Sequence, residues 1–107
     1  MKKQFAILGC GRFGSAMARE LCELGNEVLV VDKDEDRIND IADEVTHALI
    51  LDITDDEAVS ELGLGNFDVV AVTMSNDLRS AVMAVVLAKE AGCKRVIAKA
   101  SDALGAK

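Results

Sequence analysis

The chain has 107 residues, of which 12 are Lys or Arg and 19 are Asp or Glu, so its formal net charge is −7. Half of the residues are hydrophobic, which is enough for one packed core and argues against intrinsic disorder. The acidic balance excludes the basic surface that nucleic acids and anionic membranes require. We therefore expect one acidic domain over residues 1–107, in which an anionic ligand needs a local binding device.

Three cysteines and one histidine leave little material for disulfides, metal sites or histidine-based catalysis. Cys10, Cys22 and Cys93 are odd in number and lack C-x-x-C spacing, which favours a reducing cytoplasm. The longest apolar run, residues 81–88, is far too short to cross a bilayer, and the first residues do not form a signal peptide. We expect a cytoplasmic protein without membrane insertion, metal ligands or catalytic residues.

Short apolar runs alternate with polar, periodic segments along the chain. Five runs predict strands, at residues 5–8, 28–31, 47–51, 69–72 and 96–98. Their aliphatic and β-branched character predicts strands that are buried on both faces, as in a parallel sheet. Right-handed crossovers then predict an α/β fold, a Rossmann-like doubly wound sheet in strand order 3-2-1-4-5, truncated before a sixth strand.

Three helices are expected between the first four strands. The first covers residues 13–24, ends at Gly25 and has an apolar face made of Phe13, Met17, Leu21 and Leu24. The second covers residues 34–43 and is expected to bury Ile38, Ile41 and Ala42. Thr54 begins a capping box before a short third helix, which is expected to bury Ala58 and Leu62.

The fourth helix, at about residues 77–91, has two apolar faces. One face, expected to cover the sheet, consists of Leu78, Ala81, Val82, Val85 and Ala88. The opposite face consists of Met83, Ala84 and Leu87. This second face is either ordinary exposed surface or a subunit contact. We predict a homodimer or a larger homo-oligomer that uses this helix.

A glycine-rich segment, Gly9-Cys10-Gly11-Arg12-Phe13-Gly14, directly follows the first strand and opens the first helix. This is the G-x-G-x-x-G pattern in the context that it requires. Gly9 permits the tight turn, Gly11 lets a pyrophosphate approach the backbone, and Gly14 lets the helix pack closely on the strand. The helix N-terminus adds a partial positive charge, so the motif predicts a phosphate site at residues 9–14. The alternative is a strand-to-helix turn that holds no ligand.

Two side chains inside this segment each have two possible interpretations. The guanidinium of Arg12 either grips a terminal phosphate or is simply solvated at the helix start. The thiol of Cys10 is either redox-sensitive, because a helix N-terminus can lower its pKa, or a small hydrophobic group.

Asp32 ends the second strand, 18 residues after Gly14, where a ribose-binding carboxylate is expected. The alternative for Asp32 is the N-cap of the next helix. Lys33 follows it and joins the candidate site. An ionised Asp32 accepts hydrogen bonds from ribose hydroxyls and repels a 2′-phosphate, so the expected ligand is NAD(H) or an adenosine phosphate such as ATP or ADP.

The remaining candidates follow the later strands. Asp52 and Ile53 come after the third strand, where an adenine would lie, although Asp52 is equally well explained as a solvated acid. The segment after the fourth strand, at the point where the strand order reverses, consists of Thr73, Met74, Ser75 and Asn76. Lys99 either neutralises phosphate or lies at the sheet edge.

Together these motifs resemble the regulator-of-potassium-conductance (RCK) N-terminal domain, also called TrkA-N, of Ktr and Trk gating subunits. The resemblance rests on residues 5–14, 31–32, 46–48, 66–70 and 97–100. It implies a gating ring of dimers beneath a potassium-translocating membrane subunit, with ATP, ADP or NAD(H) as a regulatory ligand that is not turned over. It also implies that Arg12 contacts phosphates, Asp32 the ribose, and Asp52 with Ile53 the adenine side.

Such domains continue from the fifth strand into a further helix, a sixth strand and a crossover helix, whereas this chain stops five residues after Ser101-Asp102. We therefore expect a fragment of a longer regulatory subunit, peripheral to the membrane through its partner. The alternative function is the cofactor-binding half of an NAD-dependent dehydrogenase, which requires a catalytic residue near the nicotinamide. An NAD-sensing transcription factor is a third class, which the net charge of −7 disfavours.

Overall fold

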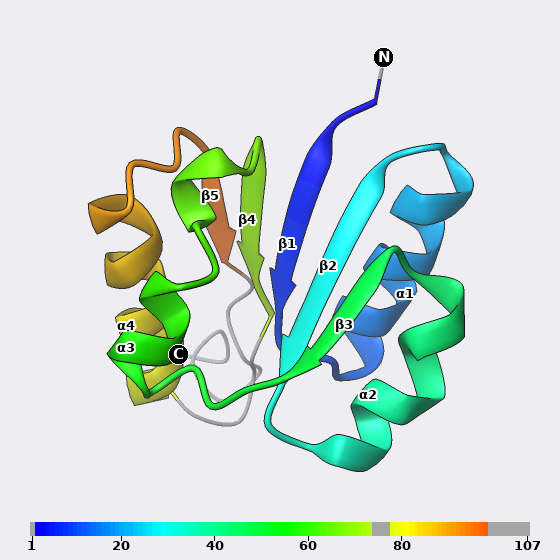
Figure 1. The fold of residues 1–107 in the computed structure, drawn as a ribbon, viewed down its shortest axis with the longest axis horizontal. Helices are drawn as coiled ribbons and strands as arrows, with labels where there is room; N and C mark the ends of the chain where they lie inside the picture. Colours follow the sequence, from blue (N-terminus) through cyan, green and yellow to red (C-terminus); the bar gives the residue numbers. More distant parts are fainter. Residues whose placement is uncertain (1, 74–77, 99–107) are drawn as a thin grey trace, which may run out of the picture.

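The computed structural model describes residues 2–73 and 78–98, which form one parallel five-stranded sheet (Figure 1). The strand order is β3-β2-β1-β4-β5, which confirms the predicted fold class and order. The strands are β1 (Gln4–Leu8), β2 (Glu27–Asp32), β3 (His47–Ile50), β4 (Val69–Val72) and β5 (Val96–Ala98). Because all of them run in the same direction, their carboxyl ends meet at one edge of the sheet.

Helices cover the two faces of this sheet (Figure 1). The helices α1 (Arg12–Glu23) and α2 (Glu35–Ile41) lie on one side, and α2 continues into the 3-10 turn η1 (Ala42–Glu44). On the other side lie α3 (Asp56–Ser60), the 3-10 turn η2 (Leu64–Asn66) and α4 (Leu78–Glu90). Within residues 2–73 and 78–98, no helix is long and apolar enough to span a membrane.

Alternate residues of the central strands build two separate cores, because successive side chains of a strand point to opposite faces. On the α1 and α2 side, strand residues such as Ile7, Val30 and Ala71 pack with helix residues Ala18 and Ile38. The core on the other side contains Leu8, Val31, Val72, Ile53, Val59, Leu64, Ala84 and Ala88. The glycine-rich segment therefore begins at the end of β1, which is fixed from both faces.

The edge strands depart from the expectation that all five strands are buried on both faces. Leu49 and Ile50 of β3 are 43% and 52% exposed, and Ile97 of β5 is 45% exposed. His47, at the start of β3, is also exposed. The expectation was wrong for these strands because each lies at one edge of the sheet, where the described helices cover it incompletely.

The core-facing side of α1 was predicted partly wrongly. Gly14 and Ala18 are buried, whereas Phe13 is 45% exposed and Leu24 is 70% exposed. The helix approaches the sheet through its small residues, and this rotates the bulkier Phe13 toward solvent. On the same side of the sheet, Ala42 is exposed because the chain leaves α2 for a 3-10 turn there.

The helix α4 shows the same effect. Ala84 and Ala88 are fully buried, and Leu87 packs partly buried against the core, although Ala84 and Leu87 were expected on the opposite face. Val82, expected on the sheet, is 53% exposed. Alanines allow close approach of helix and sheet, so Ala84 and Ala88 are the fully buried residues of the contact, and Val85 and Leu87 pack partly buried beside them. Among residues 79–90 of α4, the exposed large apolar residues are Val82, Met83 and Val86.

Candidate nucleotide-binding site

The glycine-rich segment makes a tight turn between β1 and α1. Gly9 has a φ of 117°, a conformation that favours glycine, and its N–H donates to the carbonyl of Val31 at 2.8 Å. Gly14 is buried, and a Cβ added there would overlap the Gly9 carbonyl oxygen and lie 2.6 Å from Oγ1 of Thr73. The first and last glycines therefore have the geometric roles that the sequence predicts.

Gly11 has a different geometry. It occupies the N-cap of α1 with extended backbone angles, φ −82° and ψ −163°, and a Cβ added there would have no heavy atom within 4 Å. Glycine has no side chain with which to cap the helix, and the residues of the first turn include no acid. The start of α1 therefore keeps its partial positive charge and lies beside open space, which suits an anion.

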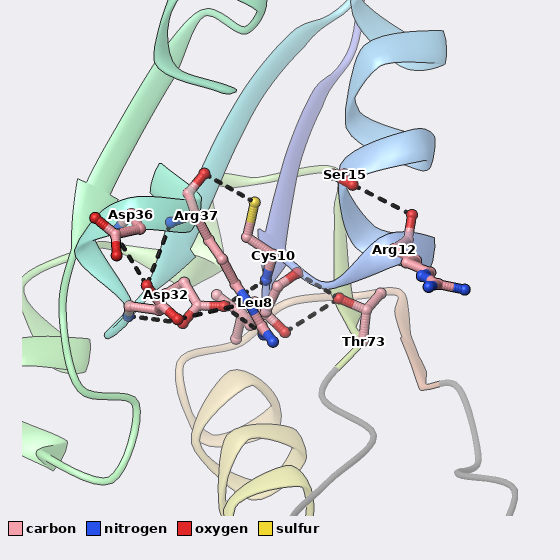
Figure 2. Close-up of polar contacts among 10 residues, drawn as sticks. Leu8, Cys10, Arg12, Ser15, Asp32, Asp36, Arg37 and Thr73 are labelled. Atoms are coloured by element: carbon pink, nitrogen blue, oxygen red, sulfur yellow. Dashed lines mark hydrogen bonds and ion pairs between the residues drawn. The ribbon is translucent and has the colours of Figure 1, made fainter. Parts of the chain in front are cut away.

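Asp32, at the end of β2, is hydrogen-bonded directly to this segment (Figure 2). Its Oδ2 accepts the N–H of Cys10 at 2.7 Å, and its Oδ1 accepts the N–H of Asp34 at 2.9 Å. The side chain is 12% exposed. The N-cap of α2 is Asp34, whose Oδ1 accepts two helix N–H groups, so the alternative role of Asp32 as that cap is wrong.

Thr73 connects the end of β4 to the same turn. Its hydroxyl donates to the carbonyl oxygen of Gly9 at 2.6 Å, and its N–H donates to the carbonyl of Leu8 at 3.0 Å (Figure 2). Thr73 is 5% exposed. A buried hydroxyl that donates a hydrogen bond to the backbone of the turn stabilises the conformation of the turn. The other candidates after β4 and β5, Met74, Ser75, Asn76 and Lys99, lie outside the described residues.

Of the two candidates after β3, Asp52 is exposed and Ile53 is buried. Asp52 is exposed, and its Oδ1 accepts both the hydroxyl of Thr54 at 2.7 Å and the N–H of Thr54 at 2.9 Å, which lowers the pKa of Asp52. Ile53 is 5% exposed and packs in the core beneath α3 and α4. The N-cap of α3 is Asp55, not Thr54, so the predicted capping box is wrong. The hydroxyl of Thr54 donates its hydrogen bond to Asp52 instead.

The side chains of Arg12, Phe13 and Lys33 are exposed. In Figure 2 the side chain of Arg12 points away from Asp32, on the far side of Thr73. Cys10 is 5% exposed, and burial is the main cause that raises the pKa of its thiol. A thiol held protonated is a poor nucleophile, so this environment favours the interpretation of Cys10 as a small hydrophobic group.

Arg37 of α2 lies beside Asp32 and was not among the predicted residues. Its Nη1 is 4.0 Å from Oδ2 of Asp32, and its Nε is 3.6 Å from Oδ2 of Asp34. A sequence signal was available, since a cation in the first turn of a helix opposes the helix dipole and needs a compensating partner. Within residues 2–73 and 78–98, no cluster of three or more His, Cys, Asp or Glu could hold a metal ion.

A doubly wound parallel sheet, a G-x-G-x-x-G turn at α1 and a carboxylate at the end of β2 define a Rossmann-type nucleotide-binding domain. The TrkA-N domain family matches residues 5–107, and the chain belongs to this family. The resemblance to RCK N-terminal domains is thereby confirmed.

Curated relatives of the chain include proteins that are named for potassium uptake. The chain is 43% identical over 100 residues to Ktr system potassium uptake protein A of Vibrio alginolyticus, covering 94% of this chain and 46% of the relative. It is 39% identical over 102 residues to Ktr system potassium uptake protein C of Bacillus subtilis (strain 168), covering 95% and 46%. The chain thus spans about half the length of these relatives.

Solved structures share the fold at low sequence identity. The Kef CTD of Shewanella denitrificans in its AMP-bound form has a TM-score of 0.70 and 18% identity, over 89% of this chain and 57% of that one. The GsuK channel has a TM-score of 0.75 and 15% identity, over 94% of this chain and 18% of the channel chain. At these identities the likeness establishes the fold alone.

Proposed function

We propose that this domain binds an adenine nucleotide, either ATP or ADP or the dinucleotide NAD(H), as a regulatory ligand that it does not turn over. The observation that carries the proposal is the 2.7 Å hydrogen bond between Cys10 N–H and Asp32. It joins the glycine-rich turn, the candidate phosphate site, to the carboxylate that is the candidate ribose site. Both groups lie at the carboxyl edge of the sheet, beside the point between β1 and β4 where the strand order reverses. Open α/β sheets bind their ligands at this position.

In the proposed complex the phosphates lie over the start of α1. Gly11 leaves room for their approach, and Arg12, which is exposed, contacts the outermost phosphate. The ribose hydroxyls donate to Asp32, beside Lys33. The further ligand contacts are proposed for Asp52 and Ile53 on the adenine side, and for Thr73, Met74, Ser75, Asn76 and Lys99. Cys10, Phe13 and Gly14 complete the turn that holds the phosphates.

The relatives support a biological setting for this binding. Ktr proteins named for potassium uptake support a cytosolic gating domain that acts on a potassium-translocating membrane subunit, within a longer regulatory subunit. The AMP-bound Kef CTD supports an adenine nucleotide as the ligand class. Nucleotide binding would shift the relative placement of subunits, and the membrane partner would respond to that shift. The same relatives favour this role over the cofactor-binding half of an NAD-dependent dehydrogenase.

Calorimetric titration of ATP, ADP, AMP, NAD and NADH into the purified domain tests the proposal. We expect saturable binding of at least one of them, and a preference for ATP that Arg12→Ala removes. Arg19→Ala is the matched control, because Arg19 pairs with Glu44 at 3.0 Å on the exposed surface. Absence of binding by all five nucleotides would refute the proposed function. A preference for NADH that is insensitive to Arg12→Ala would refute the phosphate contact of Arg12.

The exposed apolar residues of α4 support a second part of the proposal, self-association through this helix. Val82, Met83 and Val86 are 53%, 39% and 47% exposed. Sedimentation equilibrium is expected to detect a homo-oligomer that Met83→Glu dissociates, because a buried unpaired carboxylate is costly. A wild-type domain that stays monomeric at every concentration examined would contradict this part and leave nucleotide binding intact.

A further inference from the structure

The carboxylate of Asp32 has a charged neighbour on a second element, Arg37 of α2 (Figure 2). The guanidinium reaches toward Asp32 with Nη1 4.0 Å from Oδ2, the oxygen that also accepts the Cys10 N–H. The backbone carbonyl of Arg37 accepts the thiol of Cys10 at 3.7 Å. Residue 37 therefore contacts both the carboxylate and the glycine-rich turn.

The guanidinium of Arg37 has a second ion-pair partner, Asp34, at the N-cap of α2. Asp34 caps the helix through Oδ1, which accepts the N–H groups of Asp36 and Arg37, while its Oδ2 lies 3.6 Å from Nε of Arg37. The same side chain that starts the helix thus holds the arginine. Arg37 remains 48% exposed, whereas Asp32 is 12% exposed.

We propose that Arg37 is a positioning residue for recognition of the adenosine 2′-hydroxyl, acting through Asp32. This inference rests on the proposed function. Each carboxylate oxygen can accept two hydrogen bonds, and backbone N–H groups already take one site on each oxygen of Asp32. The two remaining sites are available to ribose hydroxyls. The guanidinium, with Nη1 4.0 Å from Oδ2, restrains the rotation of the carboxylate, so both sites keep their direction.

The size of the effect follows from the exposure of the pair. An ion pair that is half exposed contributes a coupling equivalent to about a 2- to 5-fold change in affinity. Arg37 raises the affinity for a nucleotide with a 2′-hydroxyl by this factor. It raises the affinity for a 2′-deoxy nucleotide less, because that ligand lacks one of the two hydroxyls that donate to Asp32. Arg37 therefore affects the ratio of the two affinities more than it affects binding of the phosphates.

The test compares ADP with 2′-deoxy-ADP, and NADH with its 2′-deoxyadenosine analogue, on four forms of the domain. The forms are wild type, Arg37→Gln, Arg37→Lys and the exposed control Arg19→Gln. We expect the wild type to prefer the 2′-hydroxyl, and Arg37→Gln to reduce that preference by up to about 5-fold. Arg37→Lys, which keeps the charge, is expected to retain most of the preference, and Arg19→Gln all of it.

Three results overturn the inference. In the first, the preference is unchanged in Arg37→Gln. In the second, Arg37→Gln weakens ribose and deoxyribose ligands equally, as a merely structural role would. In the third, the wild type binds ADP or NADH without discriminating the 2′-hydroxyl, which leaves the proposed function standing. If the wild type binds neither ADP nor NADH, the inference fails, and the proposed function fails as well only if ATP, AMP and NAD also do not bind.

Discussion

Substitutions at two glycines of the same turn are expected to have different effects: one lowers the stability of the fold, and the other lowers the affinity for nucleotide. In Gly14→Ala the added Cβ would overlap the backbone carbonyl oxygen of Gly9 and lie 2.6 Å from Oγ1 of Thr73. Neither atom is the far end of a flexible side chain, so β1 and α1 must move apart. Overpacking of this kind costs about 1–3 kcal/mol. For a domain of this size each kcal/mol lowers Tm by about 4–8 °C, so we expect a loss of about 4–24 °C.

Gly11→Ala is the matched variant. Its backbone angles suit alanine, and its added Cβ meets no heavy atom within 4 Å, so we expect Tm to change little. The same Cβ occupies the open space at the start of α1, so nucleotide affinity should fall. Thermal unfolding and calorimetric titration of both variants check the pair. The reasoning is refuted if Gly14→Ala melts like wild type, or if Gly11→Ala binds nucleotide with unchanged affinity.

Three further predictions concern single side chains. Asp32→Ala should weaken nucleotide binding about 10- to 100-fold by titration, because hydrogen bonds to a charged acceptor are worth about 1.5–3 kcal/mol; an unchanged affinity would exclude the ribose role. Iodoacetamide should modify the half-buried Cys22 faster than the buried Cys10, whose pKa is raised by burial, and mass spectrometry of peptides would show the opposite order if Cys10 were reactive. Thr54→Val should raise the pKa of Asp52, followed by NMR titration, since the hydroxyl of Thr54 is the main cause that lowers it. The stabilisation from this depressed pKa is present above the unfolded value near pH 4 and disappears as the pH falls through the folded value; an unchanged Asp52 titration in Thr54→Val would contradict this assignment.

The sheet and the turn at its centre could be predicted from local sequence. Alternation of apolar runs with helical segments, together with the handedness of crossovers, was enough for the strand order. The roles of Gly9 and Gly14 follow from the spacing of the motif alone. The turn depends on backbone geometry that a short segment determines by itself, whereas the strand order follows from the handedness of the crossovers.

Helix orientation could not be predicted in the same way. A helical wheel weighs residues by hydrophobicity, so it favours Phe13 and Val82 for the core, whereas Ala18 and Ala84 face the sheet. The contact is decided by how closely backbone approaches backbone, a property of the folded pair of elements. Exposure at the edge strands likewise depends on which neighbours cover them.

In the candidate site, the hydrogen-bond partners of the polar side chains could not be predicted, because several nearby groups compete for the same backbone N–H groups. Asp32, Asp34 and Thr54 are all favoured N-cap residues, and the sequence does not determine which one caps a helix and which bonds elsewhere. Arg37 could be noticed as an unfavourable cation in the first turn of α2. Its proximity to Asp32 required the three-dimensional packing of α2 beside β2.

The central claim is that an adenine nucleotide binds where the glycine-rich turn meets Asp32. Amide chemical shifts of the 15N-labelled domain, recorded during separate titrations with ATP, ADP, AMP, NAD and NADH, test it most directly. We predict saturable shifts that are largest at Gly11, Arg12 and Asp32. Shifts centred instead on the groove of about 480 Å³ between α3, η2 and α4, which Val59 and Glu90 help to line, would contradict the account, as would the absence of shifts with all five nucleotides.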